Sequence, residues 1–206
     1  DAIPLVFFRM GLAVFFISIY FIFKKKSFQV DKKGLVKFLF TGIIIALHWI
    51  FFFKAIKVSN VSVALVTMST GAFFTSLIEP IFFNRRIKTL EIILGLVVIL
   101  GLYIIFNFES QYKLGILYAL ISSFLGSLFA VLNGLFIKKY DASRISLYQL
   151  LFGTLFVTVY LLINNRFSAS FFILPSMDWV YLIILSSICT AYAFIASVKI
   201  MKFISP

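Results

Sequence analysis

The sequence predicts an all-α, polytopic membrane protein whose seven transmembrane helices belong to two inverted five-helix repeats. Of its 206 residues, 63% are hydrophobic and only 13% are charged, whereas about one quarter of the residues of soluble domains are charged. Apolar stretches long enough to cross a bilayer follow one another along the chain, and two pairs of segments resemble each other at nearly equal offsets. The first two observations exclude a soluble globular domain, and the third predicts the repeats.

Seven stretches of the chain meet the requirement of a bilayer-spanning helix, which needs roughly 20 mostly apolar residues. They are too long, and too uniformly apolar, to be strands of a membrane barrel, and helices satisfy their own backbone hydrogen bonds within lipid. We therefore predict transmembrane helices at 3–23, 35–56, 61–83, 90–108, 114–137, 145–163 and 179–201.

The connections between these stretches alternate in charge. Segments such as "KKKSFQVDKK", "NRRIKT" and "KKYDASR" carry most of the 19 lysines and arginines, whereas the opposite connections hold only Lys54, Lys57, Lys113 and Arg166. The positive-inside rule places the first group in the cytoplasm, which puts Asp1 outside. The net charge of +12 thus reports topology, and no nucleic-acid partner is expected, because the cations do not gather on one folded face.

Two segment pairs indicate an internal repeat. "FFISIYF" at 15–21 aligns with "LFVTVYL" at 155–161, and "FFKAIKV" at 52–58 aligns with "FIASVKI" at 194–200. A repeat unit of five spans inverts its second copy in the membrane, an arrangement that recurs in secondary transporters. We predict a first repeat at 1–108 that lacks its first helix and a second repeat at 114–206 that lacks its last two, from an intact protein of ten spans.

Four segments spread over the spans make the chain similar to the EamA family of the drug/metabolite transporter superfamily. They are "IPLVFFRMGLA", "FFKAIKVSNVSVAL", "LEIILGLVVILGLYIIF" and "GILYALISSFLGSLFAVLNG". The family usually has a Gly-Glu pair after the third span seen here, where this chain has "NRRI". The resemblance implies a secondary transporter of small organic metabolites, such as amino acids, that exports them across a bacterial inner membrane without ATP hydrolysis.

Ionisable groups inside a span are costly in lipid and are therefore the first places to look for a substrate path. Arg9 suits an anionic or carboxylate-bearing substrate, although it could equally reach outer phosphates or tie helices together. Histidine titrates near neutral pH, so His48 could couple transport to protons, or it could make an interhelical hydrogen bond. Glu79, next to Pro80, faces the bundle but could also snorkel to the cytoplasmic surface.

Polar and aromatic residues complete the set of residues that we expect along the path. Gln149 is the repeat counterpart of Arg9, and Asn133 and Thr190 are polar residues of the fifth and seventh spans. Trp49 could line a pocket, although aromatic residues in membrane helices more often pack against neighbours or lipid. The predicted substrate-path residues are Arg9, His48, Trp49, Glu79, Asn133, Gln149 and Thr190.

The chemistry of an enzyme is not expected. The sequence contains one histidine and one cysteine, and no spacing assembles a nucleophile with a base, a carboxylate pair or a metal cluster. Phosphate-binding glycine loops are missing as well, so we expect no cofactor, no metal and no ATP-driven pumping. The expected partners are a small-molecule substrate and the lipid bilayer, with possible proton coupling. A passive channel or a non-transporting membrane scaffold remains the alternative.

Overall fold

A computed structural model describes residues 2–87, 89–108 and 110–203, and its described part is helical with no strand. Asp1, whose side of the membrane was predicted above, and the end of the chain at 206 lie outside the described residues. The α-helices of the first half are α1 (Ala2–Phe23), α2 (Lys32–Val58), α3 (Val61–Met68), α4 (Gly71–Phe83) and α5 (Thr89–Phe108). Those of the second half are α6 (Lys113–Phe136), α7 (Ala142–Ile163), α8 (Ser176–Ser186) and α9 (Ala193–Ile200).

The helices confirm an all-α, polytopic membrane protein. Six segments are long and apolar enough to cross a bilayer: α1, α2, α3 with α4, α6, α7, and the run from α8 to α9. The remaining predicted span, 90–108, is the helix α5. Helix starts differ by a few residues because capping groups extend the helices beyond their apolar parts. Asp141 caps α7, so this helix begins at Ala142 rather than at 145.

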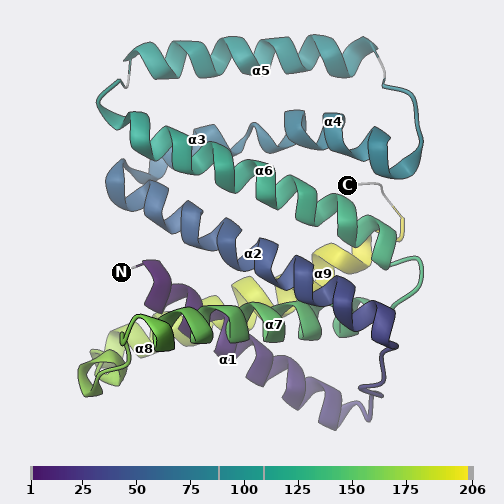
Figure 1. Ribbon diagram of the computed structural model, residues 1–206, viewed down its shortest axis with the longest axis vertical. Helices are drawn as coiled ribbons and strands as arrows, with labels where there is room; N and C mark the ends of the chain where they lie inside the picture. The colour runs from purple at the N-terminus through teal and green to yellow at the C-terminus, as the bar shows by residue number, and fades with distance from the viewer. Residues whose placement is uncertain (1, 88, 109, 204–206) are drawn as a thin grey trace. The chain divides into compact units, whose positions relative to one another are not determined.

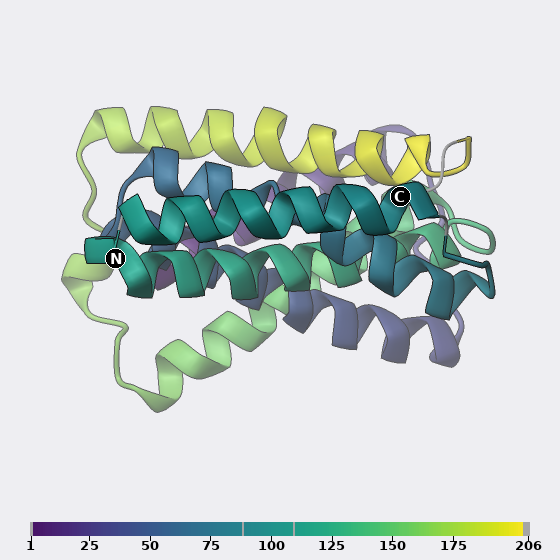
Figure 2. The same ribbon diagram turned by 90° about the horizontal axis from the view of Figure 1, so that it is seen from above.

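Two of the spans are irregular, which the sequence analysis did not predict. α3 and α4 are separated by a turn at Ser69 and Thr70 (Figure 1). The last span contains a π-helical segment, η3 (Ser187–Tyr192), between α8 and α9, and the whole run forms one uninterrupted ribbon along the upper edge of Figure 2. Within membranes, irregular backbone is tolerated only where it lies against protein or a cavity, so both places deserve a functional explanation.

The chain forms two compact units. Ile3–Ala46 and Phe136–Ser205 form one, called here the terminal unit, and Leu47–Leu135 forms the other, the central unit. The boundary falls within α2 and near the end of α6, so each unit takes residues from both predicted repeats. The repeat itself therefore stays a prediction.

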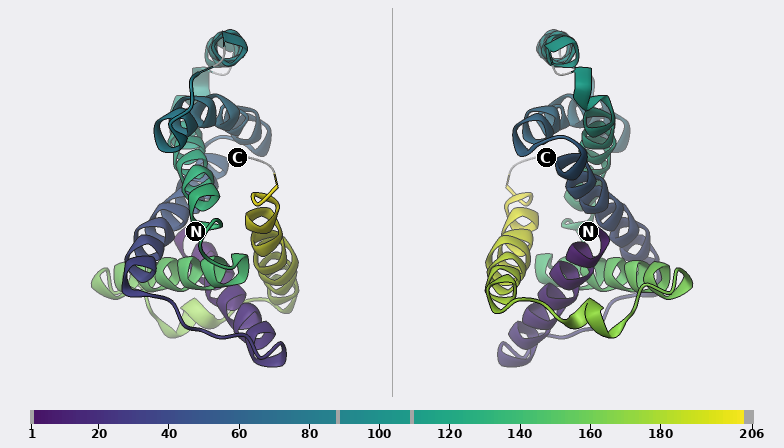
Figure 3. Two further views of the ribbon diagram at one scale, coloured as in Figure 1. Left: turned by 90° about the vertical axis from the view of Figure 1, so that its right-hand side faces the viewer. Right: turned by 90° about the vertical axis from the view of Figure 1, so that its left-hand side faces the viewer.

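The terminal unit contains α1, α7 and the run from α8 to α9. α1 crosses α7 (Figure 1), where Met10 of α1 meets Gly153 and Gly11 meets Thr154. The loop from α7 to α8 carries a short 3₁₀ helix, η2 (Ala169–Phe172), and is drawn in yellow-green in Figure 3.

At the predicted cytoplasmic end of the terminal unit, ion pairs join the connections that precede α2 and α7. Asp31 accepts hydrogen bonds from Lys139 Nζ at 2.8 Å and from the Tyr140 hydroxyl at 2.6 Å. Lys26 Nζ lies 3.1 Å from Asp141 Oδ1. Because Lys139 and then Tyr140 stabilise its charged form, the pKa of Asp31 is lowered from its ordinary value to about 2.

Replacing Asp31 by asparagine should reveal a pH-dependent stability. A carboxyl whose pKa is depressed by folding stabilises the folded state above its ordinary pKa, and that stabilisation is lost as the pH falls. The difference in melting temperature between the wild type and Asp31→Asn is thus expected to be constant near neutrality and to vanish between about pH 4 and pH 2. Thermal unfolding in detergent measures it, with the exposed Lys24→Met as control. A difference that persists undiminished at the acid end would contradict the pairing.

Candidate functional site

The terminal unit brings together two of the predicted path residues, Arg9 and Thr190. Arg9 Nε donates a hydrogen bond to Thr190 Oγ1 at 2.8 Å, across 181 positions of sequence. Thr190 is buried, and Arg9 is half-buried on α1. The guanidinium thus lies in the interior of the unit, bound to the π-helical segment, rather than extended toward outer phosphates.

The π-helical segment is organised around Thr190 itself. Its hydroxyl donates to the Leu185 carbonyl oxygen, five residues earlier, at 2.7 Å. A π turn has one more residue per hydrogen-bonded ring than an α turn, and single π turns occur often at functional sites. The same hydroxyl therefore accepts from Arg9 and stabilises the wide turn, so the arginine and the irregular backbone form one local structure.

Gln149, the predicted counterpart of Arg9, is fully buried on α7 in the same unit. Its Nε2 donates to Thr41 Oγ1 of α2 at 2.9 Å, and Thr41 in turn donates to the Lys37 carbonyl at 2.9 Å. A Cβ atom on Gly42 would lie only 2.5 Å from the Gln149 carbonyl oxygen. The glycine lets the α2 and α7 backbones approach closely enough for this bond.

His48 makes a reciprocal pair with Ser122 in the central unit. Its Nδ1 lies 2.8 Å from the Ser122 carbonyl oxygen, and the Ser122 hydroxyl donates to the His48 carbonyl oxygen at 2.8 Å. A carbonyl oxygen can only accept, so we assign the neutral tautomer with hydrogen on Nδ1, which makes Nε2 the nitrogen that gains a proton. The interhelical hydrogen bond expected as one of the two roles of His48 is thus present.

The imidazole of His48 packs directly against Gly126. A Cβ atom built on this glycine would lie 2.9 Å from His48 Cε1 and 3.0 Å from Nδ1. Any larger residue would push the ring away from Ser122. The lack of a side chain at Gly126 thus provides the space for the histidine ring.

Trp49 and Asn133 also belong to the central unit, and both are buried. Trp49 directly follows His48 on α2, while Asn133 lies near the end of α6, seven positions after Gly126. Their burial agrees with either a packing role or a path role.

Glu79 lies near the end of α4 that is predicted to be cytoplasmic, and it is 6% exposed. Arg85 NH2 lies 2.9 Å from Glu79 Oε2, and its NH1 lies 3.0 Å from Glu91 Oε2 on α5. Asn84, with φ 51°, turns the chain back so that this arginine can reach both acids. Glu91 and then Glu79 raise the pKa of Arg85 further above its ordinary value. Glu79 is thus buried, and its partner comes from the "NRRI" segment.

Several hydroxyl groups in the central unit escaped the sequence analysis. They surround the turn between α3 and α4, and the residues are Thr67, Thr70, Ser123 and Ser127. Serine and threonine are common in apolar helices, where their hydroxyls usually bond to their own backbone. Only the helix break distinguishes these four, and the sequence does not mark the break with proline.

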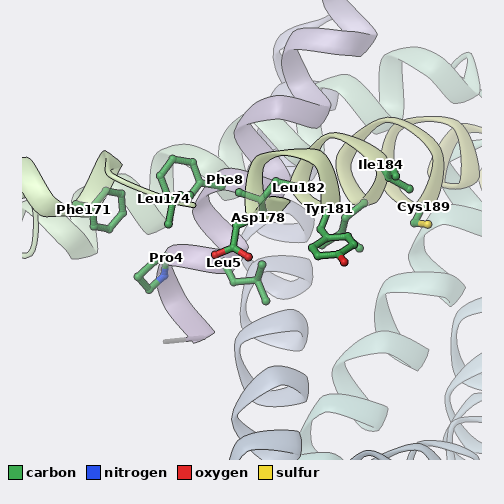
Figure 4. Close-up of a pocket in the computed structure, with 11 residues that line it drawn as sticks. Pro4, Leu5, Phe8, Phe171, Leu174, Asp178, Tyr181, Leu182, Ile184 and Cys189 are labelled. Carbon is green, nitrogen blue, oxygen red and sulfur yellow. The ribbon is translucent and has the colours of Figure 1, made fainter. Parts of the chain in front are cut away.

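A pocket of about 580 Å³ opens in the terminal unit, between the start of α1 and the run from α8 to η3 (Figure 4). Its lining is mostly apolar and contains one acidic side chain, Asp178. Phe8 and Cys189 also line it, and they are the sequence neighbours of Arg9 and Thr190. Sites for small molecules are typically concave and apolar with a few polar groups, and the sequence analysis singled out none of these lining residues as a site.

Comparison with protein families adds the decisive observation. The sequence model of the EamA-like transporter family matches residues 1–107. The chain belongs to the EamA-like transporter family. No curated protein and no solved structure gives a significant match. This EamA-like protein is therefore a multi-pass membrane protein of transporter type, which implies a small-molecule substrate and a lipid environment.

Proposed function

We propose that this EamA-like protein is a secondary transporter that exports small organic metabolites, amino acids or similar solutes, across a bacterial inner membrane by alternating access. The observation that carries the proposal is the Arg9 guanidinium, held by Thr190 inside a membrane-spanning unit. A cation at this depth is costly unless it has a polar partner or function. A carboxylate of the substrate is a suitable partner.

The geometry of the Arg9 bond favours a carboxylate over an uncharged solute. Guanidinium groups recognise carboxylates through paired N–H donors in a fixed fork. Thr190 is bound by Nε and orients the planar group from one edge. The Thr190 hydroxyl also bonds to the Leu185 carbonyl across the π turn. The proposed substrate-binding group, Arg9, is therefore attached to an irregular segment of backbone.

An inverted repeat, as predicted from the sequence, would permit alternating access, because two rocking halves can expose one central site to either side in turn. The family match ends at residue 107, next to the predicted end of the first repeat at 108. The polar residues predicted along the path, Gln149 and Asn133 among them, are buried within their units. We include them with Trp49 as lining, and we assign Glu79 to the ion pair with Arg85 at the cytoplasmic end.

Counterflow tests the proposed activity. The purified intact protein is placed in liposomes preloaded with unlabelled amino acids, and transient accumulation of the labelled solute is measured. A carrier with one alternating site accumulates label, and its rate saturates with concentration. Flux that does not saturate, without counterflow, would instead indicate a passive channel, and no flux for any solute would indicate a scaffold.

The same liposomes test whether protons drive export. With Nδ1–H bound to the Ser122 carbonyl, His48 can take up a proton on Nε2. His48→Gln keeps a hydrogen-bonding side chain but cannot titrate, so uptake driven by a pH gradient should fall to the level of exchange without a gradient. The exchange itself should continue. If the rate of wild-type uptake is the same with and without a pH gradient, transport is not coupled to protons.

A further inference from the structure

The turn between α3 and α4 leaves backbone carbonyls that lack their usual helical partners. The Ala72 N–H bonds to the Ser69 carbonyl oxygen, three residues earlier, at 3.4 Å. In a regular α-helix it would bond to the Met68 carbonyl, four residues earlier. Met68 instead accepts a hydrogen bond from the Ser123 hydroxyl of α6 at 3.1 Å. A side chain of the neighbouring helix thus replaces a missing backbone donor.

Oxygen atoms gather around this break. Thr70 Oγ1 lies 2.8 Å from the Thr67 carbonyl oxygen and 3.0 Å from Ser123 Oγ. The Ser127 hydroxyl donates to the Gly71 carbonyl oxygen at 2.9 Å. A Cβ atom on Gly71 would lie 3.4 Å from both Ser123 Oγ and Ser127 Oγ, so this glycine lies directly beside the two hydroxyls.

The Thr67 hydroxyl is the observation that indicates a ligand at this place. Its hydroxyl is fully buried and has no hydrogen-bond partner among the residues that the structure describes. On the same helix face, Ala64 packs with Ala119 of α6 one turn earlier, and Gly71 meets Ser123 one turn later. Thr67 lies between these two contacts, on the side of α3 that packs against α6. A buried hydroxyl without a partner destabilises the fold unless a ligand satisfies it.

We propose that this break binds a sodium ion, with the hydroxyls of Thr67, Thr70 and Ser123 and the Met68 carbonyl as ligands. All are neutral oxygens, the donors that hard cations prefer. The carbonyls at the end of the short helix α3 add the negative end of its dipole. The Phe74 N–H at the start of α4 already bonds to the Thr70 carbonyl, as the Ala72 N–H does to Ser69. These two N–H groups at the start of α4 are therefore already satisfied by backbone carbonyls and are not available to an anion.

This proposed sodium site differs from the metal sites that the sequence analysis did not expect, which are built from histidine, cysteine or acidic side chains. Among the described residues, no three histidine, cysteine or acidic side chains come together, and a sodium ion does not require them. Discontinuous membrane helices coordinate such ions through unwound carbonyls and helix ends. The inference does not depend on the proposed transport of metabolites: the ion could bind here whether or not the protein carries a solute.

Binding of labelled sodium to the purified intact protein in detergent tests the site. Wild type should bind ²²Na⁺, displaced by unlabelled Na⁺ and not by choline, and Na⁺ should raise its melting temperature above the value in choline at equal ionic strength. Thr67→Val and Ser123→Ala should weaken the binding about tenfold or more, because even an outer partner of a metal site contributes about 10- to 100-fold. Thr67→Ser, which keeps the hydroxyl, should bind.

Ser69→Ala is the matched control, because the Ser69 hydroxyl belongs to the same turn but is exposed and bonds only to its own helix at Val66. It should bind sodium like the wild type. Absence of ²²Na⁺ binding by the wild type would overturn the proposal, as would wild-type affinity in both Thr67→Val and Ser123→Ala. If either variant fails to fold, comparison of Thr67→Ser with wild type and Ser69→Ala still decides the case, since a loss of binding in Thr67→Ser would refute a hydroxyl ligand.

Discussion

Replacing Arg9 by alanine should abolish most transport of carboxylate-bearing solutes, with a loss of about 30-fold or more in the rate of exchange. Removing one member of a buried, hydrogen-bonded charge pair costs about 2–5 kcal/mol, and each 1.4 kcal/mol corresponds to about tenfold. Arg9→Lys should also lose most activity, since an ammonium group cannot form the paired donors of a guanidinium. Exchange in proteoliposomes measures both variants.

The control for Arg9 is Arg166→Lys, which changes an exposed arginine of the same unit at the end of α7. It should transport like the wild type. Thr190→Val should show an intermediate loss, because it removes the hydroxyl that orients Arg9 and that bonds to Leu185. Arg9→Ala transport at the wild-type rate, in protein that remains monodisperse, would show that this arginine serves packing rather than substrate binding.

Gly42→Ala should destabilise the terminal unit by forcing α2 and α7 apart. The new Cβ would lie 2.5 Å from the Gln149 carbonyl oxygen and 3.0 Å from the Gly153 backbone nitrogen. Both are backbone atoms, so α2 and α7 must separate, and the hydrogen bond from Gln149 to Thr41 must lengthen. Overpacking of this kind costs about 1–3 kcal/mol, occasionally more, and a lower melting temperature in detergent measures it.

Gly101→Ala on α5 provides the matched comparison, since a Cβ atom there would meet nothing within 4 Å. Alanine is favoured over glycine in helices by about 1 kcal/mol, so this variant should equal or exceed the wild type in stability. Equal melting temperatures for Gly42→Ala and Gly101→Ala would contradict the close approach of α2 and α7.

The predictable part of the candidate site was the identity of its polar residues. Arg9, His48 and Glu79 stand out because an ionisable group in an apolar run is rare for a physical reason, its cost in lipid. Their partners could not be predicted. Thr190 lies 181 positions from Arg9, and nothing local distinguishes its hydroxyl from that of Ser186 or Ser197. The partner of His48, the carbonyl of Ser122, is likewise known only from the structure.

The sequence by itself determined the membrane class, the spans and the family resemblance, because hydropathy over some 20 residues depends on local composition alone. The tertiary structure alone decided where the spans are irregular and which polar groups meet. The break at Ser69 and Thr70 and the π turn at Thr190 are stabilised by hydroxyls that bond to carbonyls. In lipid every backbone group needs a hydrogen-bond partner. Where that partner is a side chain on another helix, only the packed structure shows which side chain it is.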